Sequence, residues 1–199
     1  IVSLPPGFHS MRTNSACHGA VLCVDAEYGH VHGYCFSSPF KLVLVSDGFR
    51  SQASCSLYDS ASSVWGNIFS VTIANKISAT RHSILVGNTL CWLISGGEVL
   101  VFDFEMQSLV VIKTPVKNHV TNNGCFQLLR IADGGLGLAG LLDLTIQLWD
   151  RKSNSDGIHE WALLRKTIPL DEMLPRRISY AFFVGYDEDK NLVVLSTMI

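Results

Sequence analysis

The sequence predicts an all-β protein, and three observations lead to this prediction. Short apolar runs rich in β-branched and aromatic residues recur along the chain, separated by Gly, Asn, Asp and Ser. Hydrophobic residues make up 48% of the 199 residues and charged residues only 16%, a balance that suits a globular domain with one sizeable core. An aromatic residue followed by Asp ends three of the apolar runs at a nearly constant spacing.

The clearest strand pattern lies between His82 and Ile112. Four apolar runs are cut there by turn signals at Gly87-Asn88, at Gly96-Gly97 and over residues 105–107. Gly and Asn supply the positive φ angles that hairpin turns need. The stretch therefore predicts a four-stranded antiparallel meander.

The segments before this meander predict a similar set of strands. Residues 1–16 are expected to form a loop, and residues 25–38 an exposed connection, because they are rich in Gly, His, Tyr and Ser. Residues 74–81 are expected to form a polar linker. The strands are expected at Cys17–Val24, Phe40–Val45, Cys55–Asp59 and Val64–Ile73.

The same pattern returns after Pro115. Strands are expected at Cys125–Ile131, Leu136–Leu142, Thr145–Asp150 and Trp161–Ile168, with a last hairpin over 178–196. Turns are expected at Asp133-Gly134-Gly135 and near Asn154 to Gly157, and a short helical turn at Leu170–Leu174.

The repeated aromatic–Asp pair indicates the architecture. Asp103 of Phe102-Asp103 lies 44 residues after Asp59 of Tyr58-Asp59, and Asp150 of Trp149-Asp150 lies 47 residues after Asp103. A period in the mid-forties with four strands per unit is typical of β-propeller blades, with kelch-like repeats as one example, because a single sheet cannot bury both of its faces alone. Each Asp is expected to accept backbone N–H groups of the next turn, a structural role rather than a catalytic one.

We therefore predict a partial or open β-propeller of antiparallel four-stranded blades, with about three blades plus a remnant, over the single region 1–199. The blades are expected at about 17–73, 82–115 and 125–170, with an incomplete one at 178–199. A closed propeller needs at least four blades, so part of the ring is expected to be missing from this chain. The strand edges left unpaired are expected to make the chain marginally stable and prone to self-association.

Composition argues against several classes of partner and of cellular location. The formal net charge of −2 offers no basic surface for nucleic acid, and no run of 18 apolar residues predicts a membrane span. The first residues do not resemble a signal peptide. Six widely spaced cysteines, several within strand candidates, are expected to be buried free thiols, which favours a cytoplasmic or nuclear location.

The candidate ligands and motifs for chemistry favour structural interpretations. One group of possible metal ligands comprises His18, Cys23, His30, His32 and Cys35, but it lacks a Cys-x2-Cys knuckle, so we predict no metal. The Gly-rich segment 133–137 lacks the Lys-Ser/Thr of a phosphate loop, and residues 185–191, which include the acidic cluster 187–189, are expected to form a solvated hairpin tip. Packing between blades is expected for Trp65, Trp92, Trp149 and Trp161. We predict no catalytic or cofactor-binding residue, no cofactor and no enzyme activity.

Several strings resemble the C-terminal propeller region of plant F-box proteins. They are Leu85–Ile94, Val101–Ile112, Asp133–Ala139 and Ile146–Gly157, together with His18–Cys23 and Ser37–Lys41. The pattern is most similar to that of grass F-box proteins with an F-box-associated β-propeller domain, and it spans about residues 17 to 196.

The resemblance implies a role in a Skp1-cullin-F-box ubiquitin ligase. In such proteins an N-terminal F-box docks on a Skp1-like adaptor, and the propeller selects the protein to be ubiquitinated. No stretch of this chain resembles an F-box. We therefore expect a protein-interaction module whose target protein and binding residues the sequence does not name. The alternative is a propeller enzyme or a lectin-like binder of a small ligand, which should bring acids, bases or metal ligands from several blades to one mouth of the ring.

Overall fold

The computed structural model confirms an all-β chain. It describes residues 3–5, 8, 16–23, 38–48, 51–115, 123–142, 144–153, 159–164, 167–174 and 180–198. Within these ranges the chain forms strands β1 to β15 and one 3-10 turn, η1. The residues divide into two compact units, 1–79 and 80–199, which are described separately. No helix in the described part of the chain has the length and hydropathy of a membrane span.

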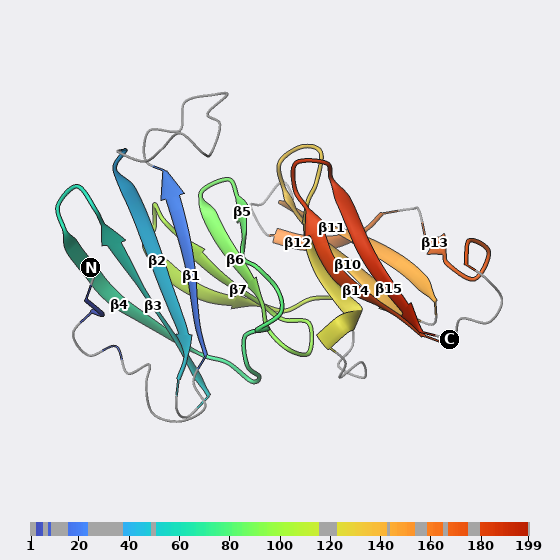
Figure 1. The fold of residues 1–199 in the computed structure, drawn as a ribbon, viewed down its shortest axis with the longest axis horizontal. Coiled ribbons are helices and arrows are strands. Elements are labelled where there is room, and N and C mark those ends of the chain that lie inside the picture. Colours follow the sequence, from blue (N-terminus) through green and yellow to red (C-terminus); the bar gives the residue numbers. More distant parts are fainter. Residues whose placement is uncertain are drawn as a thin grey trace. The chain divides into compact units, whose positions relative to one another are not determined.

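The first unit is one four-stranded antiparallel sheet in the order β1-β2-β3-β4 (Figure 1). Its strands are β1 (Cys17–Cys23), β2 (Phe40–Asp47), β3 (Gln52–Asp59) and β4 (Val64–Thr72). The two central strands carry its buried residues, among them Val43, Val45 and Cys55, whereas β4 exposes Val64 and Ile68. All four strands match the predicted segments to within a few residues.

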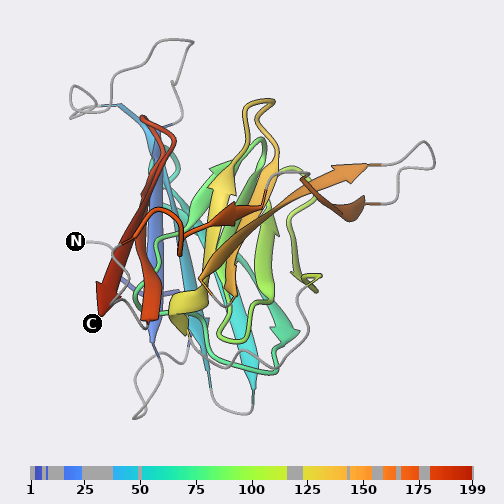
Figure 2. The same ribbon diagram turned by 90° about the vertical axis from the view of Figure 1, so that its right-hand side faces the viewer.

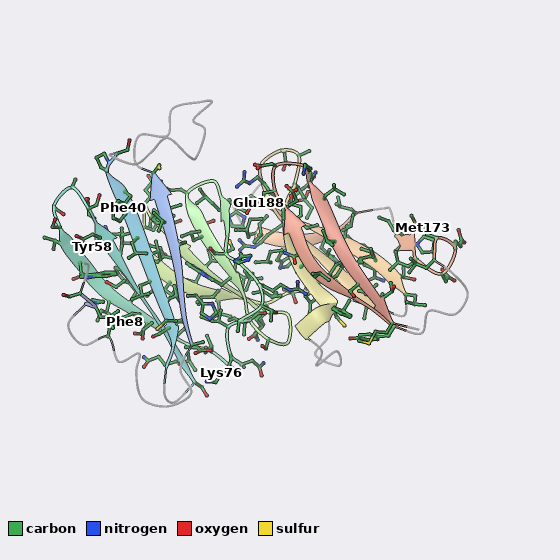
Figure 3. All side chains as sticks on the ribbon, viewed as in Figure 1. Phe8, Phe40, Tyr58, Lys76, Met173 and Glu188 are labelled. Carbon is green, nitrogen blue, oxygen red and sulfur yellow. The ribbon has the colours of Figure 1, made fainter. Side chains whose placement is uncertain are left out.

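Two local interactions order the ends of this sheet. The backbone N–H of Ala16 donates to the Asp47 carboxylate at 2.8 Å, and the N–H of Asp47 donates to the Ala16 carbonyl at 3.3 Å. At the other end, the ring centroids of Phe40 and Tyr58, both labelled in Figure 3, lie 6.3 Å apart. The ring centroid of Trp65 lies 5.2 Å from that of Tyr58. These contacts link all four strands at their ends.

The second unit begins with the meander predicted over 82–112. It consists of β5 (Ile84–Val86), β6 (Thr89–Leu93), β7 (Val99–Asp103) and β8 (Ser108–Ile112), all antiparallel. Gly87 closes the first hairpin with a φ of 54°, and Gly96 and Gly97 close the second with φ angles of 91° and 93°. The third hairpin turns at residues 104–107, where Gln107 has a φ of 46°. The three predicted turns are therefore confirmed, and Gly supplies the left-handed backbone in the first two.

A five-stranded sheet follows. It contains β9 (Phe126–Arg130), β10 (Leu136–Leu142), β11 (Thr145–Ser153) and β12 (His159–Leu163), with β13 (Ile168–Pro169) added to β11. Cys125, predicted to begin a strand, instead ends η1 (Asn123–Cys125). The predicted helical turn is present, because the N–H of Leu174 donates to the Leu170 carbonyl at 2.8 Å. The turn expected near Asn154 to Gly157 lies outside the described residues.

The last element is the two-stranded hairpin of β14 (Tyr180–Asp187) and β15 (Leu192–Met198). Ile178, the predicted start, lies outside the described residues, and the tip at Glu188 to Asn191 is a turn, as expected. A bulge between Phe183 and Gly185 interrupts the ladder. Within the described ranges, the two strands pair only with each other, whereas the other sheets have four strands or more.

The sheets of the second unit pack face to face, and the sheet containing β9 to β12 is buried on both faces. Leu128 and Leu138 pack with Val99 and Val101 of the β5–β8 sheet. Their chain neighbours Leu129 and Ala139 point to the opposite face and pack with Phe183 of β14. This alternation along each strand is what one blade between two others requires. Successive antiparallel sheets stacked in this way confirm a partial propeller.

Candidate protein-interaction surface

The turns that follow the first strand of each sheet meet at one end of the second unit. Strands β5, β9 and β14 precede these turns, and β9 lies against both of the others. Arg130, the last residue of β9, contacts the end of β5 on one side and the β14–β15 tip on the other. We call Leu85, Arg130, Tyr186, Glu188 and Asn191 the Arg130 cluster.

Hydrogen bonds from backbone and side chains fix the Arg130 cluster. The Arg130 Nη2 group donates to the Leu85 carbonyl at 2.7 Å and to Glu188 Oε2 at 2.8 Å, and Nε donates to the same carbonyl at 3.2 Å. The Tyr186 hydroxyl accepts the Arg130 backbone N–H at 3.3 Å and lies 2.8 Å from Asn191 Oδ1. One residue thus connects three neighbouring sheets.

The electrostatics of this cluster favour a positioning role. Burial raises the pKa of Glu188, the positive charge of Arg130 opposes that shift, and the neighbouring Asp189 reinforces it. The side chains of Arg130 and Glu188 are 42% and 36% exposed, so water screens their attraction and the pair adds little stability. Figure 3 shows Glu188 at the tip of the β14–β15 hairpin, where it orients the turn.

Two of the three repeated aspartates have the predicted structural role. Asp59 Oδ1 accepts the backbone N–H groups of Ala61 and Ser62 at 2.8 and 3.4 Å. Asp103 Oδ1 accepts those of Glu105 and Met106 at 2.9 and 2.8 Å. Each carboxylate satisfies donors that the turn leaves unpaired, which fixes the hairpin.

Asp150 does not have this role, and the prediction was wrong there. Asp59 and Asp103 are the last residues of their strands, but β11 continues past Asp150 to Ser153. Ladder pairs such as Arg151–Trp161 and Lys152–Glu160 extend the hairpin beyond the Asp. Figure 2 shows β11 and β12 projecting as a long hairpin from the second unit. Because the next residues are strand rather than turn, no backbone N–H in the described part of the chain donates to Asp150 as in the other two turns, and its carboxylate instead pairs with Lys152 at 3.0 Å.

The sequence pattern missed two further aspartates that fix turns. Asp133 Oδ1 accepts the N–H of Gly135 at 3.1 Å, and Asp187 Oδ1 accepts that of Lys190 at 3.2 Å. The hydrogen bond from the Lys190 backbone is also the main cause of the lowered pKa of Asp187. The sequence signal that could have predicted this role is an Asp placed two or three residues before a residue of the predicted turn.

Trp149 and Trp161 pack between two sheets, as predicted, whereas Trp65 packs against Tyr58 of its own sheet. Trp149 lies in the cluster between the β5–β8 and β9–β12 sheets, and its ring lies over Gly140, where a Cβ atom would come within 2.7 Å. Trp161 packs beside the same cluster and donates its indole N–H to the Lys113 carbonyl at 2.9 Å. Trp92 is fully buried, whereas Trp65 is half-buried and donates to the Ser3 carbonyl.

The cysteines differ in burial. Cys55, Cys91 and Cys125 are buried thiols, as expected, and burial raises the pKa of Cys55 to about 12 and that of Cys91 to about 11. Cys17 is exposed, contrary to the expectation that the thiols are buried, because β1 is an outer strand of its sheet. The thiols of Cys55 and Cys91 are therefore almost wholly protonated at neutral pH and react poorly.

The predicted group of metal-ligand candidates is only partly described. His18 and Cys23 lie five residues apart on β1, so their side chains leave opposite faces of the strand. His30, His32 and Cys35 lie outside the described residues. Among the residues that the structure does describe, no three His, Cys, Asp or Glu side chains form a group able to hold a metal ion. The absence of a metal stays a prediction.

Arg81 is a buried cation in the second unit. It is 8% exposed, its Nη2 group donates to the Phe183 carbonyl, and its Nε has no hydrogen-bond partner in the described part of the chain. Burial lowers the pKa of this guanidinium. Arg81 therefore connects the segment before β5 with β14, a contact that holds the last hairpin.

Comparison with known proteins identifies a family. A family model described as F-box protein AT5G49610-like, beta-propeller, matches residues 12–196, which is nearly the whole chain. The match extends over both units and takes in strands β1 to β14 and all but the last two residues of β15. No curated protein matches the chain.

Proposed function

Since the chain belongs to the family of F-box protein AT5G49610-like β-propellers, we propose that it is the domain that selects the target protein of a ubiquitin ligase. It acts by binding, without catalysis of its own. An F-box docks on a Skp1-like adaptor, and the propeller holds the target beside the enzyme that transfers ubiquitin. A plant origin, kelch-like repeats and a cytoplasmic or nuclear location are parts of the same proposal.

The observation that best supports a binding role is that the polar residues of the described sheets hold turns in place. Asp59, Asp103, Asp133 and Asp187 all serve turns, and the Arg130 cluster joins turns of three sheets. Such contacts stiffen the loops on which propellers present binding residues. The alternative of a propeller enzyme or lectin-like binder predicts acids and bases gathered at one mouth, and no observation in the described residues favours it over protein binding.

The test joins this chain to a heterologous F-box helical domain and expresses the fusion in cells. Quantitative proteomics then measures which proteins fall in abundance and recover when the proteasome is inhibited. We expect a small set of proteins that is also captured by the chain without an F-box. A fusion carrying an unrelated propeller is the control.

Two results would count against the proposal. Either the fusion depletes the same proteins as the unrelated propeller, or the proteins that the chain captures keep their abundance when the fusion is present. Both outcomes separate binding through this chain from the general effect of an added F-box.

A further inference from the structure

The carboxylate of Asp150 is buried, but only one of its two oxygens has a partner in the described part of the chain. Asp150 is 3% exposed, Oδ2 lies 3.0 Å from Lys152 Nζ, and Oδ1 has no hydrogen-bond partner in the described part of the chain. An unpaired buried carboxylate oxygen is costly, and most such oxygens in folded proteins have a partner. This oxygen therefore points to a group that the described part of the chain does not supply.

The residues that pair with Asp150 on the two adjacent strands bring no polar side chain to the carboxylate. Its ladder partners are Gly137 on β10 and Ala162 on β12, whose side chains are a hydrogen atom and a methyl group. Ile131 packs over Gly137, 2.9 Å from where a Cβ atom would lie. Leu148, two residues earlier on β11, faces the core. The carboxylate thus lies where a buried apolar face ends, with Lys152 next along the strand.

Lys152 is held only weakly beside the Asp150 carboxylate. Its side chain is 60% exposed, and the hydrogen bond to Asp150 is the first cause of its raised pKa, followed by the charges of Asp150 and Asp133. An exposed ammonium gains little from such a pair because water competes for it, whereas the buried carboxylate needs a cation, so another cation can replace Lys152 at small cost. A single ammonium position also leaves Oδ1 unused.

We propose that Asp150 receives a basic side chain of the bound protein, preferably an arginine, and that Lys152 fills its place in the unbound chain. A guanidinium donates two parallel N–H bonds to the two oxygens of one carboxylate, so it pairs with Oδ1 and Oδ2 together. Asp133, close enough to act on Lys152, adds attraction for the incoming charge. This inference rests on the proposed function and gives the chemistry of one contact with the target.

The experiment uses capped Gly-Arg-Gly as the probe, with Gly-Lys-Gly and Gly-citrulline-Gly as matched peptides. Titrations of the labelled chain follow the backbone amide signals of Gly137 and Ala162. The arginine peptide should bind more tightly than the lysine peptide, and the citrulline peptide, which has no charge, should not bind. Lys152→Met should raise the affinity about tenfold by removing the internal competitor, and Lys152→Arg should lower it below that of the unchanged chain.

Asp150→Asn should abolish binding, while Asp189→Asn, at the exposed hairpin tip, should leave it unchanged. If Asp150→Asn does not fold, the opposite effects of the two Lys152 variants still decide the matter. The proposal is overturned if the arginine peptide fails to bind the Lys152→Met chain, if Asp150→Asn binds equally well, or if citrulline matches arginine.

Failure here is distinct from failure of the proposed function. If the peptides do not bind but the F-box fusion still depletes its targets, the Asp150 receptor is wrong and the recognition role stands. If the peptides bind as expected but the fusion depletes nothing, the recognition role fails and the Asp150 receptor stands as a site for basic side chains.

Discussion

Arg130 donates to the carbonyl of Leu85 at 2.7 Å across 45 residues of sequence, and so joins the first strands of two sheets. Arg130→Met should lower the free energy of unfolding by about 1–2 kcal/mol, because a backbone acceptor loses a charged donor. Arg130→Lys should recover only part of this, since an ammonium cannot reproduce the guanidinium fork. Chemical denaturation measures both. Equal stability of the Met variant and the unchanged chain would show that the Arg130 cluster does not stabilise the fold.

Phe183 tests whether the last hairpin is part of the core. The side chain is 1% exposed and packs with Leu129 and Ala139 of the neighbouring sheet. Phe183→Ala should therefore cost about 3–5 kcal/mol in denaturation, as for other buried aromatic residues. Val184→Ala, the exposed neighbour, is the control and should cost little. Similar small losses for both would mean that the hairpin does not pack on the β9–β12 sheet in solution.

The thiols should differ in reactivity. Burial raises the pKa values of Cys55 and Cys91, whereas Cys17 is exposed. Brief alkylation of the folded chain at mildly alkaline pH should label Cys17 and spare Cys55 and Cys91, and unfolding should make all three reactive. Peptide mapping by mass spectrometry reads the labelled sites. Fast labelling of Cys91 in the folded chain would contradict its place in the core.

His18 should make the stability depend on pH. Burial lowers its pKa below the ordinary value of 6.5, and the nearby Asp47 opposes the shift only in part. The unfolded state then binds a proton more readily than the folded state, so stability is full above that value and falls as the pH drops below it. His18→Gln should flatten this decline in urea denaturation, while His159→Gln, on exposed β12, should not. An unchanged slope in His18→Gln would remove His18 as the cause.

Local pattern was enough to predict most of the fold. The meander over 82–112 was predictable because Gly87, Gly96 and Gly97 mark turns that need positive φ, and these turns alone set the strand register. The repeated Asp predicted the hairpins at Asp59 and Asp103 for the same reason, since each Asp contacts residues only two or three positions ahead.

Features that depend on distant residues were not predictable in this way. The residues Arg151 to Ser153 have the composition of a turn, but pairing with His159 to Trp161 makes them strand, and Asp150 changes its role as a result. The Arg130 cluster depends on a carbonyl of another sheet, which leaves no mark in the local sequence. The residues that would contact a target have no common type or spacing, so the sequence could not name them.

The most direct test of target recognition is ubiquitin transfer reconstituted from purified parts. The ligase contains this chain joined to an F-box domain, and the substrate is a protein captured by the chain. Adding an excess of the chain without an F-box should suppress ubiquitination of that substrate, because the free chain binds the substrate but cannot dock on the adaptor. Ubiquitination that continues at the same rate in the presence of excess free chain would contradict the account.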